Sequence, residues 1–120
     1  AKEINVPMSI AIVGNDGRLI HFKRMDGALP ISIDLAPAKA YSAYSLRMTT
    51  EKLKTLTEPG AMLYGLDKSC DNIVIFGGGI PIKFNSEVIG AVGVSGGSVQ
   101  EDIKVADSGV NFFENRYTTN

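Results

Sequence analysis

The sequence predicts an α+β sandwich, with an antiparallel sheet of about five strands and helices that flank it. Short β-branched runs are separated by tight turns, which favours antiparallel pairing of successive strands. Two longer segments have helical periodicity and capping residues, so they can cover the faces of such a sheet. With 120 residues, the chain has room for one domain with a real core, and we expect residues 1–120 to form it.

Composition excludes several classes of protein. Twelve basic and thirteen acidic residues give a net charge of −1, which argues against binding nucleic acid by neutralising many phosphates. No segment approaches the roughly 18 apolar residues of a membrane-spanning helix, so we expect no membrane partner. The one cysteine, Cys70, excludes an intrachain disulfide and fits a reducing compartment.

The first half of the chain begins with a predicted hairpin. Residues 8–13 form a short apolar run typical of a buried strand, and residues 14–17 have turn chemistry. Residues 18–25 then alternate, which places Leu19 on one face of a second strand. Ile20, Phe22 and Arg24 are expected together on its other face. Residues 1–5 resemble the last turn of a helix.

A helix is predicted from Ser32 or Asp34 to Met48. With Asp34 as its N-cap, Pro37 falls in the first turn, where a missing N–H costs nothing. Small residues share one face of this helix and suggest close packing on the sheet: Ala36, Ala40 and Ala43. Thr50 is expected to cap a second, shorter helix that residues 58–60 end.

The second half is expected to add three strands and a helix. Residues 61–72 form an irregular connection, and residues 73–76 are typical of a buried strand. Residues 80–84 contain Pro81, which indicates an edge strand or a bulge, and residues 87–94 form a glycine-containing strand. A capping box at Ser98 and Glu101 opens the last helix, whose apolar stripe comprises Ile103, Ala106, Val110, Phe113 and Tyr117.

Common catalytic and metal motifs are missing. The glycines at 77–79 precede a strand-like segment, whereas a phosphate-binding loop opens a helix. The glycines at 96–97 do precede a helix but lack the rest of such a motif, so turn or packing roles are favoured. One histidine and one cysteine are too few for a structural zinc site, and nothing in their spacing joins them into a catalytic pair.

His21 and Cys70 are the two side chains that could bind iron. An imidazole is a good ligand for iron or another transition metal, and alternation directs His21 away from Phe22. From the residues alone, a surface or interface histidine stays an open alternative. Cys70 is a candidate soft ligand, and a loop cysteine that only packs is its alternative.

Several blocks in order along the chain resemble the GlcG/HbpS-like family, which was labelled haem-degrading. They are residues 17–19, 24–28, 39–40, 76–82 and 88–97, followed by Asp102. Residues 59–60 and 63–65 look most similar to the C-terminal domain of PduO-type cobalamin adenosyltransferases, which serve propanediol-use microcompartments. The chain departs from the family pattern at Arg18, where histidine is frequent, and at Ser42, where threonine is common.

This resemblance implies a profilin-like sandwich that assembles into homo-oligomers and binds haem in some members. It also implies that the chain is the C-terminal part of a longer polypeptide with an N-terminal enzymatic domain. The expected location is cytoplasmic, within or near a bacterial microcompartment. On this basis His21 is the expected axial ligand of haem iron, and Cys70 is the alternative ligand. Arg24 and Lys39 are the expected partners of the haem propionates.

Three hypotheses about function follow. The first is a haem-binding, self-associating accessory domain for haem or iron handling or sensing, with no catalytic activity of its own or only a weak one. The second is an assembly module that sets the oligomeric state of an attached enzyme, for which small residues at 90–93 suit packed subunit contacts. The third is enzymatic haem breakdown, which needs a distal pocket and a source of reductant.

Overall fold

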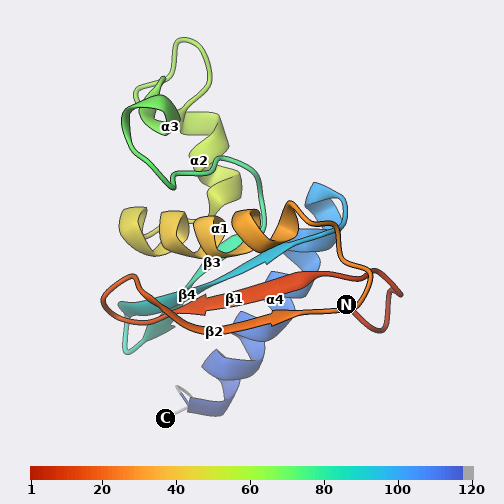
Figure 1. The fold of residues 1–120 in the computed structure, drawn as a ribbon. Coiled ribbons are helices and arrows are strands. Elements are labelled where there is room, and N and C mark those ends of the chain that lie inside the picture. Colours follow the sequence, from red (N-terminus) through yellow and green to blue (C-terminus); the bar gives the residue numbers. More distant parts are fainter. Residues whose placement is uncertain (118–120) are drawn as a thin grey trace.

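The computed structural model describes the backbone of residues 1–117 and the side chains of residues 1–115. Its elements follow in chain order as β1 (Ser9–Val13), β2 (Leu19–Arg24), α1 (Ser32–Leu46), α2 (Thr50–Leu56), α3 (Leu66–Ser69), β3 (Gly79–Phe84), β4 (Glu87–Ser95) and α4 (Val99–Tyr117). The Tyr117 side chain, expected on the apolar stripe of the last helix, lies outside the described residues. Figure 1 shows α1 and α4 on opposite faces of the sheet, which confirms the predicted α+β sandwich.

The sheet is antiparallel, and its strand order is β2-β1-β4-β3. It has four strands within the described residues, because the predicted strand at 73–76 does not join it. That segment runs along α1 instead: the Val74 N–H donates to Ser42 Oγ at 2.8 Å, and Ser42 Oγ donates to the Asn72 carbonyl at 3.1 Å. The expectation of about five strands was therefore one too high. Pro81 lies in β3, an edge strand, as predicted.

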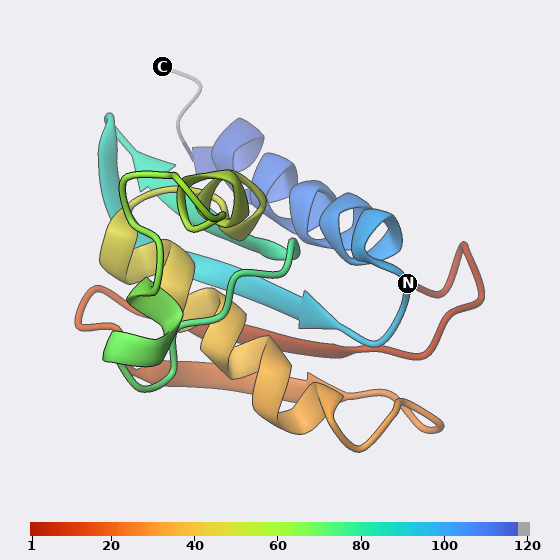
Figure 2. The ribbon, with the colours of Figure 1, turned by 90° about the horizontal axis from the view of Figure 1, so that it is seen from above.

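The two main helices cover different parts of the sheet. Helix α1 packs against β1, β3 and β4, whereas α4 packs against β3 and β4 and leaves β1 and β2 uncovered on its side (Figures 1 and 2). Close approach of α1 depends on small residues, as predicted: Ala36, Ala40 and Ala43 are buried against the sheet. Gly93 lies directly beneath α1, and a Cβ atom there would overlap the Ala36 carbonyl oxygen.

Local capping signals were partly correct. Helix α1 begins at Ser32 with Ile31 as N-cap and no side-chain cap, so Asp34 is a first-turn residue and not the cap. Helix α2 is capped by Thr49, whose Oγ1 accepts from the Lys52 N–H at 3.1 Å, one residue before the expected Thr50. The Thr49 cap matters because it satisfies an N–H group that the first turn of α2 leaves without a partner.

The capping box of α4 is confirmed. The Glu101 N–H donates to Ser98 Oγ at 3.1 Å, and the Ser98 N–H donates to Glu101 Oε1 at 2.8 Å. Residues 2–5 form a turn instead of the expected end of a helix, closed by a bond from the Asn5 N–H to the Lys2 carbonyl at 3.1 Å.

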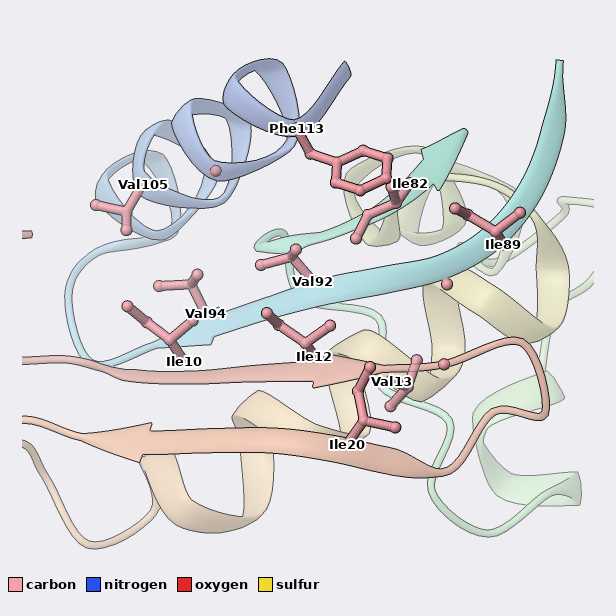
Figure 3. A pocket seen from close by; sticks show the side chains of 13 residues that line it. Ile10, Ile12, Val13, Ile20, Ile82, Ile89, Val92, Val94, Val105 and Phe113 are labelled. Carbon is pink, nitrogen blue, oxygen red and sulfur yellow. The ribbon is translucent and has the colours of Figure 1, made fainter. Parts of the chain in front are cut away.

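The hairpin contains a bulge that changes which face Ile20 occupies. Ile12 pairs with His21 but Val13 pairs with Leu19, so Ile20 is an extra residue on β2. Phe22 packs against the buried alanines beneath α1, whereas Ile20 points toward the α4 side (Figure 3). The expectation that Ile20 and Phe22 share a face was wrong, because an inserted residue interrupts the alternation of side chains between the two faces of a strand.

Candidate functional site

The part of the sheet that α4 leaves uncovered forms an apolar groove. It lies between α4 and the β1–β2 hairpin and encloses about 410 Å³. Figure 3 shows side chains from β1, β2, β3, β4 and α4 converging on it, among them Ile10, Ile12, Ile20, Ile82, Val92, Val105 and Phe113. None of the described residues that line it has a charged or polar side chain. A groove of this size and character is suited to an apolar ligand.

His21 lies beside this groove. It pairs with Ile12 in the antiparallel register of β1 and β2, and directly opposed residues share a face of the sheet. The imidazole is exposed and therefore stands next to the groove floor without being packed into it. The sequence-based expectation of an accessible imidazole agrees with this placement.

Lys23 shares that face and was missed by the sequence analysis. It pairs with Ile10, another groove residue, and its side chain is exposed. Residues two apart on a strand are about 7 Å apart, so the ammonium group of Lys23 and the imidazole of His21 flank the same edge of the groove. The alternation of side chains along β2 could have identified Lys23, because residues two positions apart on a strand lie on the same face of the sheet.

Arg24 lies on the opposite face of β2. It pairs with Ser9, whose hydroxyl is hydrogen-bonded to the hydroxyl of Ser32 in α1 at 2.7 Å. Arg24 therefore belongs to the α1 side of the sheet and does not flank the groove beside His21.

Lys39 is buried in the protein. Its side chain is 2% exposed, and its Nζ donates to Asp102 Oδ2 and to the Val94 carbonyl oxygen, each at 2.9 Å. The ammonium thus links α1 to the end of β4 and to the first turn of α4. It does not line the groove, so the structure does not bring it together with His21.

Cys70 is exposed and follows α3. The segment after it is hydrogen-bonded to α1 through Asn72 and Ser42, on the face of the sheet that the groove does not occupy. His21 and Cys70 therefore lie on opposite sides of the sheet and do not meet at one iron within a single chain. No group of three or more His, Cys, Asp or Glu side chains in the described part could hold a bare metal ion.

The fold and the groove together define a class: a small sandwich whose antiparallel sheet has a ligand-sized apolar groove on one face. The chain belongs to the HbpS-like family, since the family model described as "Haem degrading protein HbpS-like" matches residues 1–111. Within the described residues, no helix combines the length and apolar character that crossing a membrane requires.

Two curated relatives are similar over nearly the whole chain. An uncharacterized 15.0 kDa protein in the dhaT-dhaS intergenic region of Citrobacter freundii is 45% identical over 114 residues, which are 94% of this chain and 80% of the relative. The corrinoid adenosyltransferase PduO of Citrobacter freundii is 38% identical over 111 residues. That match covers 92% of this chain but only 33% of PduO.

Two solved structures have the same fold. The Klebsiella pneumoniae protein ORFY superimposes with a TM-score of 0.92 at 43% identity, covering 95% of this chain and 79% of ORFY. The complex of PduOC with heme superimposes with a TM-score of 0.90 at 37% identity, covering 92% of this chain and 81% of PduOC.

Proposed function

We propose that this domain binds haem in the apolar groove, with the His21 imidazole as an axial ligand of the iron. The observation that carries the proposal is the pairing of His21 with Ile12, which puts an exposed imidazole beside an aliphatic groove of about 410 Å³. Membership of the HbpS-like family and the similarity to PduOC, whose structure is a heme complex, support haem as the ligand.

The residues at the groove fit the chemistry of a haem group. The faces of a porphyrin are apolar and pack well on aliphatic side chains, and its two propionates form charge-assisted hydrogen bonds with cations. Lys23 lies on the same face as His21 and supplies such a cation at the groove edge, whereas Arg24 and Lys39 do not. When bound, haem would supply an iron centre whose properties depend on this axial ligand.

Self-association is the second part of the proposal. The groove is open along β2, where Ile20 is 69% exposed, and an apolar surface of this kind is costly to leave in water. A second copy that covers the β2 side would enclose a haem group more fully than one chain does. An assembly module without haem is the competing function, because the same open groove also suits contact between subunits.

The setting of the domain is the third part. The match to PduO covers a third of that protein, so a domain of this kind can be one part of a longer polypeptide. We propose an accessory role beside a corrinoid adenosyltransferase, in the cytoplasm and at a microcompartment. Association with a separately expressed adenosyltransferase domain, measured by co-elution in size-exclusion chromatography, tests this role. Independent elution of the two would argue against it.

A haemin titration followed by absorbance, with the mass measured in solution, tests the proposal. Gly109 lines the groove from α4, and a Cβ atom there meets open space, so Gly109→Leu should fill the groove and abolish saturable haem binding. Ser108→Leu, one residue away and outside the groove lining, is the matched control and should bind normally. A defined oligomer that takes up haem without saturation, or equal binding by both variants, would favour the assembly module.

A further inference from the structure

A second, smaller cavity lies at the C-terminal end of β4 and shares no lining residue with the groove. It encloses about 170 Å³. Its floor contains the ion pair between Lys39 and Asp102, with the two residues only 2% and 3% exposed. A charge pair this deeply buried contributes little net stability compared with apolar side chains of the same volume, so its presence in the wall of a cavity calls for a chemical explanation.

The hydrogen bonds of this pair leave one donor and further acceptor positions that a ligand could use. An ammonium has three donors, and Lys39 Nζ uses two of them on Asp102 Oδ2 and the Val94 carbonyl oxygen, each at 2.9 Å. Asp102 Oδ1 accepts from the Gly97 N–H at 2.9 Å, and each carboxylate oxygen can accept a second bond. The pair can therefore donate one bond and accept another at the same place. A hydroxyl group can match both, because it donates one bond and accepts another.

The rim of the cavity is apolar, and its side chains come from three separate segments. Leu29 and Ile31 precede α1, Phe76 precedes β3, and Val99 is the first residue of α4; all four are exposed. Large apolar side chains gathered at the mouth of a cavity with a few converging polar groups are typical of small-molecule sites. Beneath this rim, the bonds of Lys39 and Asp102 join α1, the end of β4 and the start of α4.

The charge of the floor restricts the ligand further. Lys39 and Asp102 neutralise each other, so a charged ligand would bring an uncompensated charge into a site with apolar walls, which is costly. A neutral ligand avoids this cost. We propose that the cavity binds a small neutral aliphatic alcohol, whose hydroxyl accepts from Lys39 and donates to Asp102 while its alkyl chain packs on Leu29, Phe76 and Val99.

Amide chemical shifts in a titration of the intact domain with n-butanol test this site. We expect saturable shifts at Gly96, Gly97 and Val99, with a dissociation constant on the order of 10 mM. Butyrate and n-butylammonium have the same alkyl chain length with charged ends, and we expect each to bind at least tenfold more weakly. Shifts that grow linearly without saturation would overturn the proposal, because they would show no specific binding. Equal affinity for the three compounds would also overturn it, because the cavity would then not distinguish a neutral hydroxyl from a charged end.

Two variants identify the cavity as the place of binding. Phe76→Ala removes one exposed wall without touching the core, and we expect it to weaken n-butanol binding about fivefold. Met62→Ala, also an exposed apolar residue but outside the cavity lining, is the matched control and should leave the affinity unchanged. Equal effects of both variants, or shifts centred on groove residues such as Ile12 and Val92, would show that the alcohol does not occupy this cavity.

Discussion

His21 stands directly opposite Ile12 in the antiparallel pairing of β1 and β2. In such pairs the two Cβ atoms lie about 4.5–5.5 Å apart on one face of the sheet, and here that face is the floor of the groove (Figure 3). A planar ligand that packs on Ile12 is therefore within reach of the imidazole. The proposed haem site depends on this relationship.

The first prediction concerns His21→Ala. We expect the Soret band of the haemin complex to shift and the affinity to fall about tenfold or more, because the variant removes the proposed axial ligand. The residue is exposed, so the free energy of unfolding should change by no more than about 0.5 kcal/mol. Cys70→Ala, run beside it, should leave the spectrum unchanged. An unaltered Soret band in His21→Ala would show that His21 is not the axial ligand.

The second prediction compares Lys23→Gln with Arg24→Gln. These neighbours face opposite sides of β2, so of the two only Lys23 can pair with a carboxylate at the groove. We expect Lys23→Gln to weaken haemin binding by about 0.2–1 kcal/mol, the usual range for an exposed ion pair, and we expect this loss to shrink at high salt. Arg24→Gln should bind as the unaltered protein does. A larger loss from Arg24→Gln, measured by the same titration, would place the propionates elsewhere.

Local signals in the sequence were sufficient for much of the fold. Successive strands with turn residues between them predicted the hairpin, and the spacing of Ser98 and Glu101 predicted the start of α4 correctly. These features depend on residues that are close in the chain. The strand order β2-β1-β4-β3 could not be obtained this way, because it depends on pairing between distant segments.

The candidate site was less predictable for the same reason. The bulge at Ile20 arises from the register of two strands, and the groove exists because α4 leaves one half of the sheet open. Lys39 and Asp102 are 63 positions apart, so no spacing rule links them. His21 could be singled out only because it is the one histidine, whereas its relation to Ile12 required the structure.

The third prediction concerns the buried pair of Lys39 and Asp102. Removing one partner leaves the other charge buried without compensation, which costs about 3–5 kcal/mol. We therefore expect Lys39→Met and Asp102→Asn each to lower the free energy of unfolding by this amount in urea denaturation. The double variant Lys39→Met with Asp102→Leu should recover much of the loss, because no charge remains buried. Two single variants with losses below about 1 kcal/mol would mean that the pair is well hydrated.

The fourth prediction tests self-association through the open side of the groove. Ile20→Lys places a charge on the exposed apolar edge of β2, and burying that charge between subunits is costly. We expect the mass in solution to fall toward the 12.8 kDa of a single chain. Met62→Lys is the control, since Met62 is also an exposed apolar residue, 81% exposed, but lies outside the groove. If Met62→Lys alone caused dissociation, the interface would lie at the segment between α2 and α3 and not at the groove.

The fifth prediction contrasts two glycines that look alike in the sequence. At Gly93 a Cβ atom would overlap the Ala36 carbonyl oxygen of α1, so Gly93→Ala must push α1 away from the sheet. Overpacking of this kind usually costs 1–3 kcal/mol, and we expect about 3 kcal/mol or more because the obstacle is backbone that cannot rotate away.

Gly109 is the opposite case, because it lies inside α4 and a Cβ atom there meets nothing within 4 Å. Gly109→Ala should therefore raise the free energy of unfolding by about 1 kcal/mol, the difference in helix propensity between the two residues. Thermal and urea unfolding of both variants measure these changes. A stabilised Gly93→Ala would mean that α1 is not seated on β4 as described, and a strongly destabilised Gly109→Ala would mean that the groove beside it is filled.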